Sequence, residues 1–357
     1  MDAEIAELPL PASLEAEGGA AFAEMVAMTN AVTASVLGRS DLAGEPAAEL
    51  AEARDPYSSV RIALARLDGR IVGRCLAVVP LEEGSRTAEV EVDVLPEARG
   101  QGIGSALLAW GAEVAGSAGR QVLQCWPFHR AVVPGEEVLV PPTAAGAVPA
   151  ADAGARYLSR HGWRLGQVYR VSRIELSEAR AATVSTGRAA REAASDYDLL
   201  TWTGATPPEH LDDLALLHAR MPIDAPQSDL AVDEQEWNAD RVLSHDERNS
   251  RGGILVVTAA ARHRTSGRLV AFSTAYLGTD RSRPADQGDT LVLKEHRGHR
   301  LGVLVKAGLH EEIERVSPET PAVVTYNAEE NRRMLAVNEA IGFRAVGSVG
   351  VWEKRTP

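Results

Sequence analysis

The strongest constraint on the fold is an internal repeat. The segment Gly69-Arg70-Ile71-Val72-Gly73 recurs as Gly267-Arg268-Leu269-Val270-Ala271, and Arg99-Gly100-Gln101-Gly102-Ile103-Gly104 recurs as Arg297-Gly298-His299-Arg300-Leu301-Gly302, in both cases 198 residues further on. Two matches in one register indicate a duplicated domain. A chain of 357 residues is long enough for two domains, each with a core of its own.

A third pair of matching segments locates an insertion in the first copy. Gly162-Trp163 and Gly342-Phe343 are only 180 residues apart, so the first copy is longer by about 18 residues. Residues 127–151 contain five prolines and interspersed glycines, which are typical of irregular structure. We therefore place the insertion there.

Hydrophobic periodicity predicts the same order of elements in both copies. In the first copy it predicts strands at 58–67, 70–80, 87–95, 121–126 and 164–176 and helices at 21–37, 102–119 and 153–160, with Asp68-Gly69 as a two-residue hairpin turn. In the second it predicts strands at 197–203, 253–261, 268–277, 290–293, 322–326 and 343–352 and helices within 208–220, 234–246, 301–316 and 329–341. Both copies are of the mixed α/β (α+β) class. We expect domains at 1–176 and 196–357, joined by a linker at 177–195 that is rich in Ala, Ser and Thr and for which a partly helical structure is the alternative.

Composition excludes several classes of protein. The formal charge of −13 argues against a sequence-independent nucleic-acid binder and favours cationic small molecules such as amines as ligands. Only two cysteines, Cys75 and Cys125, are present, so a disulfide framework is excluded and a reducing cytoplasm is expected. The N-terminus lacks the features of a signal peptide, and no uninterrupted apolar run is long enough for a membrane span. We expect neither export nor membrane insertion.

The segment Arg99-x-x-Gly102-x-Gly104 lies between a predicted strand and a predicted helix. Unpaired N–H groups at the start of a helix favour an anion, and glycines let a phosphate approach the main chain. Alternatively, the segment is only a tight turn between the strand and the helix and binds nothing. The chain has no GK[ST] motif and no G-x-G-x-x-G spacing, which argues against the common nucleotide-binding loops.

The run from Val94 to Leu108, VLPEARGQGIGSALL, resembles the acetyl-CoA-binding motif of the GNAT superfamily of N-acetyltransferases. Because the repeat extends it, the resemblance covers nearly the whole chain as two tandem domains, an arrangement similar to that of mycothiol synthase. It implies that each domain is a mixed, mostly antiparallel sheet flanked by helices, and that residues 1–176 form an acetyl-CoA-binding domain. It also implies contacts with acetyl-CoA at Val94, Arg99, Gly100, Gln101, Gly102, Ile103, Gly104 and Ser105.

The second copy departs from the motif, because Arg300 stands at the position of Gly102. An arginine there could clamp a phosphate by charge or block the loop by its bulk. Farther on, Asn327, Asn331 and Gly342-Phe343 resemble the superfamily segment in which an Asn at the start of the last helix contacts the pantetheine arm. The resemblance thus gives a second set of cofactor contacts at Val292, Arg297, Gly298, His299, Arg300, Leu301, Gly302 and Asn331.

The repeat also suggests a catalytic base. Glu91 and Asp289 occupy the same register in the two motif strands, where a carboxylate could take a proton from an ammonium group through water. Alternatively, these carboxylates lie on a solvated face of the strand and have no catalytic role. Many superfamily members carry a Tyr as the proton donor for the thiolate, but Leu158 and Asn338 stand at those positions, and Tyr157 is one residue away. We assign no catalytic acid.

No HExxH or similar spacing predicts a metal site, and His296, His299 and His310 are expected at the surface or beside the phosphates. The sequence thus predicts a cytoplasmic, metal-independent acyltransferase that moves acetyl from acetyl-CoA to a primary amine of a small molecule by direct attack. Alternatives are a biosynthetic enzyme similar to mycothiol synthase, and a CoA-binding protein with one or both domains non-catalytic. No nucleic-acid or membrane partner is expected, and a tandem repeat can mimic a dimer, which is compatible with a monomer.

Overall fold

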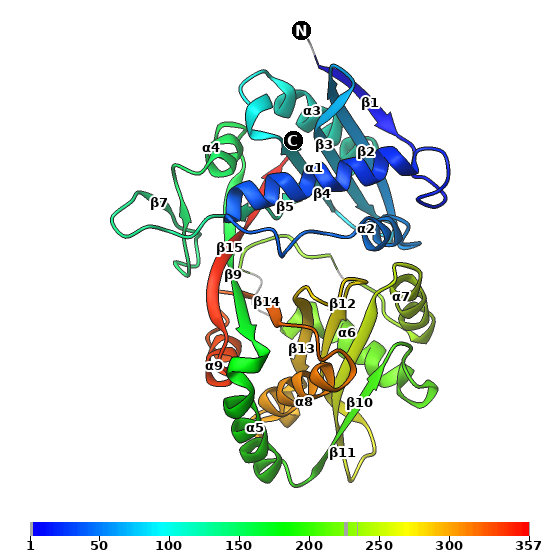
Figure 1. The fold of residues 1–357 in the computed structure, drawn as a ribbon, viewed down its shortest axis with the longest axis vertical. Coiled ribbons are helices and arrows are strands. Elements are labelled where there is room, and N and C mark those ends of the chain that lie inside the picture. The colour runs from blue at the N-terminus through cyan, green and yellow to red at the C-terminus, as the bar shows by residue number, and fades with distance from the viewer. Residues whose placement is uncertain (1–2, 225–227, 234, 357) are drawn as a thin grey trace. The chain divides into compact units, whose positions relative to one another are not determined.

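The computed structural model describes residues 3–224, 228–233 and 235–356. The chain forms two compact units (Figure 1). Unit 1 contains residues 1–169, 227–233 and 347–357, and unit 2 contains residues 170–226 and 234–346. The units differ from the expected domains, since the end of the chain belongs to unit 1 and the end of the first copy belongs to unit 2.

Unit 1 is a sheet with helices on both faces (Figure 1). Its strands are β1 (Glu4–Leu8), β2 (Ser58–Leu67), β3 (Arg70–Pro80), β4 (Thr87–Val94), β5 (Val122–Cys125) and the short β6 (Phe128–His129), β7 (Val138–Leu139) and β8 (Val148–Pro149). Its helices are α1 (Gly19–Leu37), α2 (Pro46–Ala53), the 3-10 turn η1 (Pro96–Ala98), α3 (Ile103–Ser117) and α4 (Ala153–Arg160). Helix α1 lies across the near face in Figure 1, and α3 packs on the opposite face.

Unit 2 repeats this order. Its strands are β10 (Tyr197–Thr203), β11 (Leu255–His263), β12 (Leu269–Leu277), β13 (Ala285–Val292) and β14 (Ala322–Ala328). Its helices are α5 (Leu176–Ala193), η2 (Pro208–His210), α6 (Leu211–Asp224), α7 (Ala239–Arg251), η3 (Lys294–His296), α8 (Leu301–Val316) and α9 (Arg332–Ile341). The mixed α/β fold class is confirmed.

Two long strands, β9 (Arg164–Glu175) and β15 (Arg344–Arg355), each contribute to both units. In unit 1 the strand order is β1-β2-β3-β4-β5-β15-β9, and in unit 2 it is β9-β14-β13-β12-β11-β10. Within unit 1, β15 pairs antiparallel with β5, with Trp352 opposite Cys125. The last strand of the chain therefore completes the sheet of the first copy.

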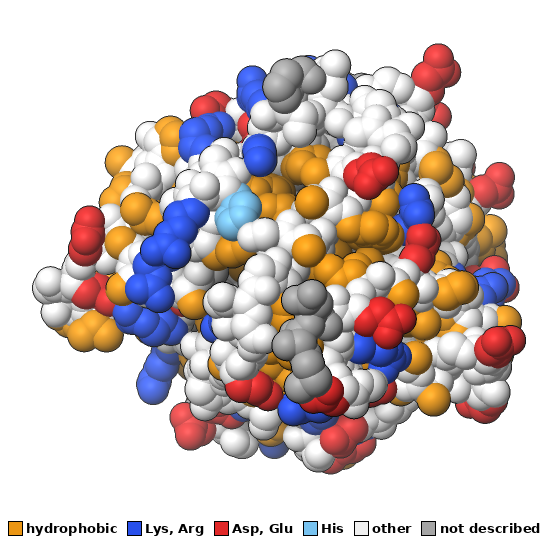
Figure 2. Space-filling model, turned by 90° about the horizontal axis from the view of Figure 1, so that it is seen from above, with side chains coloured by type: hydrophobic (Ala, Val, Ile, Leu, Met, Phe, Trp, Pro, Cys, Tyr) orange, Lys and Arg blue, Asp and Glu red, His pale blue; other side chains and the backbone are white. Residues whose placement is uncertain are grey.

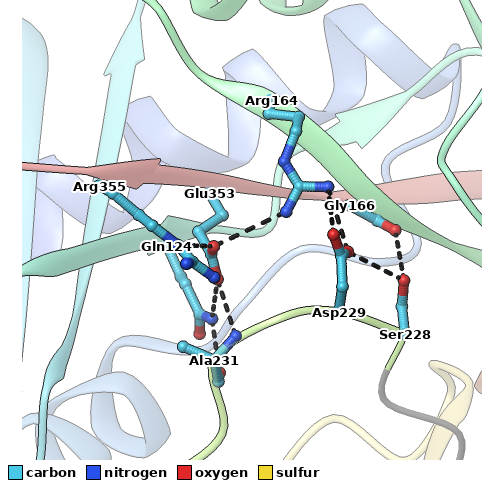
Figure 3. A network of polar contacts seen from close by, with 8 residues as sticks. All are labelled: Gln124, Arg164, Gly166, Ser228, Asp229, Ala231, Glu353 and Arg355. Atoms are coloured by element: carbon cyan, nitrogen blue, oxygen red, sulfur yellow. Dashed lines mark hydrogen bonds and ion pairs between the residues drawn. The ribbon is translucent and has the colours of Figure 1, made fainter.

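Figure 3 shows the polar contacts that hold this last strand in unit 1. Glu353 is buried, and its carboxylate accepts hydrogen bonds from the backbone N–H of Ala231 (2.8 Å) and from Nε2 of Gln124 (3.3 Å). Nearby, Arg164 pairs with Asp229 at 3.0 Å. Residues 228–233, which follow α6 in the sequence, are thus bound to β5, β9 and β15 of unit 1.

Most predicted elements are present, and the exceptions have local causes. The predicted linker is instead helix α5, in which Gly187 and Ala190 are part of the buried face. Asp68 and Gly69 have φ values of 50° and 80° and form the predicted two-residue hairpin. The predictions omitted β1 and α2, because each is too short for its periodicity to stand out.

Helix α1 is long and apolar enough to span a membrane by length and composition alone. Its residues Phe22, Met25, Val26, Met28 and Val32 are buried in the main apolar cluster of unit 1. A core helix of a folded domain passes the same test, and this packing accounts for the apolar face of α1.

Candidate functional site

The predicted loop of unit 1 forms an open turn between β4 and α3. Gly100 and Gly102 have φ values of 78° and 83°, and a Cβ atom added to either would meet no other atom within 4 Å. Nε of Arg99 donates a hydrogen bond to the carbonyl oxygen of Val94 (3.0 Å), which holds the loop against the end of the strand. No side chain caps the start of α3. Its first N–H groups are therefore free to bind an anion.

The other residues predicted in this loop divide into two groups. Gln101 and Ser105 are exposed, whereas Ile103 is buried in the core, so it could contact a ligand only through its backbone. Oγ of Ser105 lies 3.0 Å from Nε2 of His161. A Cβ atom on Gly104 would lie 3.3 Å from the ring of Tyr157, so only glycine fits beside this ring without a shift.

The loop of unit 2 has the same backbone despite its different sequence. Gly298 and Arg300 have φ values of 94° and 57°, and Nε of Arg297 donates to the carbonyl oxygen of Val292 (3.2 Å). The start of α8 is likewise uncapped by any side chain. Leu301 is buried, and the ring of His299 lies 5.5 Å from that of Tyr197. Arg300 is exposed and occupies the left-handed region that glycine occupies in unit 1.

Beside each loop, two parallel strands of the sheet stop pairing. Strand β4 pairs in parallel with β5 only from Thr87 to Glu89, and β13 pairs with β14 only from Ala285 to Gln287. The last residues of β4 and β13 extend beyond these pairs toward the loops. A ligand held at the loop could therefore form backbone hydrogen bonds with these strand ends.

The two motif strands differ in one respect. Strand β4 pairs regularly with β3 from Glu89 to Val94, whereas the pairing of β13 with β12 shifts between Ser273 and Ala275. This bulge changes the surroundings of the strand. Nε2 of Gln287 donates to Oγ of Ser273 (2.8 Å), which lies 2.7 Å from Oγ1 of Thr290.

Glu91 lies in an acidic cluster around one buried arginine. Arg74 is 6% exposed and contacts Glu91 at 3.1 Å and Asp93 at 2.9 Å. Burial raises the pKa of Glu89 to about 8, with a contribution from the neighbouring charge of Glu91. Burial also raises the pKa of Glu91, although the Arg74 guanidinium opposes this effect. The carboxylates outnumber the cations here, so the cluster favours a positively charged group.

Asp289 has quite different neighbours. Its Oδ2 atom lies 3.3 Å from Nδ1 of His218, which is 6% exposed on α6. The His218 ring stacks on Trp237 with centroids 4.3 Å apart and contacts Phe272 edge-on at 4.9 Å. Sequence reasoning did not identify His218, because a single histidine on an amphipathic helix carries no spacing signal.

The predicted pantetheine contact, Asn331, caps α9 by accepting a hydrogen bond from the backbone N–H of Met334 (3.2 Å). Nδ2 of Asn338 donates to Oδ1 of Asn327 (2.6 Å). In unit 1 the Tyr157 hydroxyl is buried, and burial raises its pKa. No comparable hydroxyl stands at Asn338.

The histidines near the second loop are not alike. Nδ1 of His296 lies 3.0 Å from the hydroxyl of Tyr197, whereas His310 is 1% exposed, so of its two expected locations the surface is wrong. Among the described residues no group of three or more His, Cys, Asp and Glu side chains could hold a metal. Cys75 and Cys125 are buried free thiols.

The surface shown in Figure 2 has apolar side chains gathered in the middle and a row of Lys and Arg to one side. Acidic side chains are scattered around the apolar middle. On this face the excess of acidic residues is therefore not collected into one patch.

Comparison with known proteins shows which proteins the chain is similar to. Residues 34–130 match the acetyltransferase (GNAT) family, a segment that contains β4, the glycine loop and α3. The structure is similar to a tandem GNAT protein from the clavulanic acid biosynthesis pathway, with a TM-score of 0.73, 24% identity and 99% of each chain covered. It also resembles a GCN5-related N-acetyltransferase from Sphaerobacter thermophilus, with a TM-score of 0.59 and 16% identity. The match covers 98% of this chain and 95% of that protein. No curated protein sequence matches the chain.

The chain therefore has the fold of tandem GNAT proteins, and residues 34–130 of unit 1 match the acetyltransferase (GNAT) family. The resemblance noted in the sequence is confirmed at this level.

Proposed function

We propose that the protein transfers an acetyl group from acetyl-CoA to a primary amine of a small molecule. The open turn at Gly100 and Gly102 carries the proposal, because a phosphate can approach the free N–H groups of α3 without meeting a side chain. The pyrophosphate would bind there, and the thioester would lie along the free end of β4 or β13. Both motif strands also carry a carboxylate, Glu91 or Asp289, at the register proposed for the base.

The reaction needs no resident metal. The neutral amine attacks the thioester carbonyl carbon, the C–N bond forms, and the C–S bond breaks with its electron pair leaving on the CoA thiolate. The ammonium form must first lose a proton, which is the role proposed for Glu91 or Asp289. The acidic cluster around Arg74 favours a cationic substrate in unit 1.

Two measurements test the proposal. Calorimetric titration with acetyl-CoA counts the binding sites, and release of free CoA thiol in the presence of a panel of primary amines reports transfer. We expect at least one site and amine-dependent thiol release. Binding without transfer to any amine would instead favour the CoA-binding alternative, and activity confined to a cysteinyl sugar would favour a biosynthetic enzyme similar to mycothiol synthase.

Separate Glu91→Gln and Asp289→Asn variants then locate the base. One of them should lower turnover by ~10²-fold or more, with little change in the KM for acetyl-CoA. If both single variants and the double variant keep full activity, neither carboxylate takes part in proton transfer.

A further inference from the structure

The carboxylates at the two equivalent positions have partners of different chemistry. Glu91 contacts the guanidinium of Arg74 at 3.1 Å, and Asp289 contacts the imidazole of His218 at 3.3 Å. A guanidinium stays protonated at any pH at which the protein is folded, so it cannot exchange a proton with a substrate. An imidazole exchanges protons near neutral pH. Only in unit 2 can the residue that contacts the carboxylate, His218, therefore accept and release a proton.

The position of His218 fixes which nitrogen is free to react. Nδ1 faces the Asp289 carboxylate, which favours the tautomer with the proton on Nδ1 and leaves the lone pair on Nε2. Stacking on Trp237 and the edge contact with Phe272 hold the ring in place. Asp289 itself is 40% exposed at its side chain, so the pair reaches the solvent-accessible side of the sheet.

The bulge in unit 2 lies beside this pair. Ser273 pairs with Thr290 and Ala275 with Gln287, so Asp289 lies in the bulge itself, whereas Glu91 on β4 is regularly paired with β3. A bulge re-aims the side chains of the strand that contains it. The imidazole partner and the bulge both occur in unit 2 and not in unit 1.

We propose that His218 is the proton acceptor for acetyl transfer in unit 2, with Asp289 as the residue that positions it. This inference rests on the proposed function, assigns its chemistry to unit 2, and moves the role of the base there from Asp289 to His218. Nε2 of His218 takes a proton from the substrate ammonium. The neutral amine then attacks the thioester carbon, the CoA thiolate leaves, and the second proton lost by the nitrogen passes to water.

The central experiment compares His218→Gln with the wild-type protein. We expect kcat/KM for the amine to fall by ~10²-fold or more, while the Kd for acetyl-CoA measured by calorimetry stays within about twofold. In both proteins kcat/KM should rise with pH as more of the substrate amine becomes neutral, so the loss in His218→Gln should be greatest at low pH and should shrink at high pH. Asp289→Asn should lower kcat by less than His218→Gln does, because it removes only the residue that positions the ring.

The pH dependence must be separated from that of neighbouring groups. The titratable and charged groups around His218 are Asp289 on β13, His245 on α7 with its ring 6.1 Å away, and Arg241, whose guanidinium lies over the Trp237 ring at 4.9 Å. His245→Gln should therefore not show the loss at low pH that is expected of His218→Gln. His210→Gln, which changes a histidine of η2 that contacts Trp202, should keep both rate and pH profile.

A folding defect is distinguished from a catalytic one by rescue. His218→Ala leaves space beside Trp237, so added imidazole should restore part of the rate, and unfolded protein would not respond. Wild-type activity with an unchanged rate and pH profile in His218→Gln would overturn this inference and leave the proposed function standing. Absence of transfer by the wild-type protein to any amine would overturn the proposed function, and the role of His218 with it.

Discussion

Gly102 and Arg300 begin equivalent helices with the same left-handed backbone, at φ values of 83° and 57°. The strand before each loop is tied to it by the same hydrogen bond, from Arg99 to Val94 and from Arg297 to Val292. The loop geometry is thus maintained although a non-glycine residue in this region carries a conformational cost. At this position the two copies therefore differ in the side chain, which Gly102 lacks and Arg300 has.

Replacing Arg300 by Gly should raise the stability of the protein by about 1 kcal/mol, because glycine adopts a positive φ without strain. Chemical denaturation measures this change. The control is Arg300→Ala, which removes the same side chain but keeps the strained backbone, and it should show no such gain. We also expect acetyl-CoA to bind Arg300→Gly as well as the wild type or better. A large loss of affinity in both variants would mean that Arg300 is itself a ligand of the phosphates.

Replacing Gly102 by Arg should weaken acetyl-CoA binding to unit 1 by at least about tenfold, because the new side chain enters the space proposed for the pyrophosphate. Calorimetry measures the loss. Gly84 is a matched control, since it has a φ of 82° and equally open surroundings but lies in the loop between β3 and β4. Gly84→Arg carries a similar backbone strain and should leave binding unchanged. Equal affinity in Gly102→Arg would contradict an acetyl-CoA site at this loop.

Replacing Arg74 by Met should destabilise the protein by about 3–5 kcal/mol, because Glu91 and Asp93 would lose their shared counter-ion. A carboxyl group whose folded pKa is raised binds its proton more tightly in the folded protein, so its contribution to stability falls as the pH rises. The pKa of Glu89 is raised to about 8 already. The loss in Arg74→Met should therefore be greater at pH 8.5 than at pH 5.5 when urea unfolding is compared. Arg70→Met, which removes an exposed ion pair with Glu97, should cost less than about 1 kcal/mol.

Replacing Lys306 by Met should stabilise unit 2. Lys306 on α8 is fully buried, its Nζ atom has no hydrogen-bond partner among the described residues, and burial lowers its pKa to about 7. In the same part of the chain, neither ring nitrogen of His310, one turn later, has a hydrogen-bond partner, and burial lowers its pKa to about 3, so it stays neutral and adds no second charge. The unfolded chain binds a proton at Lys306 up to about pH 10.4. The stability of the wild type should therefore rise as the pH increases from about 7 toward 10.4.

The gain in Lys306→Met should be on the order of 3 kcal/mol at pH 7 and small near pH 10.5. Urea unfolding at the two pH values measures it. Lys294→Met, at an exposed lysine of η3, is the control and should change stability little at either pH. A gain that does not depend on pH would indicate improved packing rather than removal of a buried amine.

The sequence alone determined the order of the elements in both copies and the type of loop that precedes each motif helix. Amphipathic periodicity and the Asp68-Gly69 turn depend on neighbouring residues, so they could be read without the fold. The equivalence of Glu91 and Asp289 could also be read from the sequence, because the repeat offset of 198 residues relates the two positions.

Only the tertiary structure decided which strands pair and which side chains meet. Residues 347–355 complete the sheet of unit 1 through backbone hydrogen bonds, which form with any sequence, so no motif predicts that this strand pairs there. The contact of Asp289 with His218, against that of Glu91 with Arg74, is likewise invisible in the sequence. It depends on a helix and a strand more than sixty residues apart, and on a bulge that one copy has and the other lacks. The repeat fixed where a carboxylate stands, and packing across the sheet fixed what chemistry that carboxylate can support.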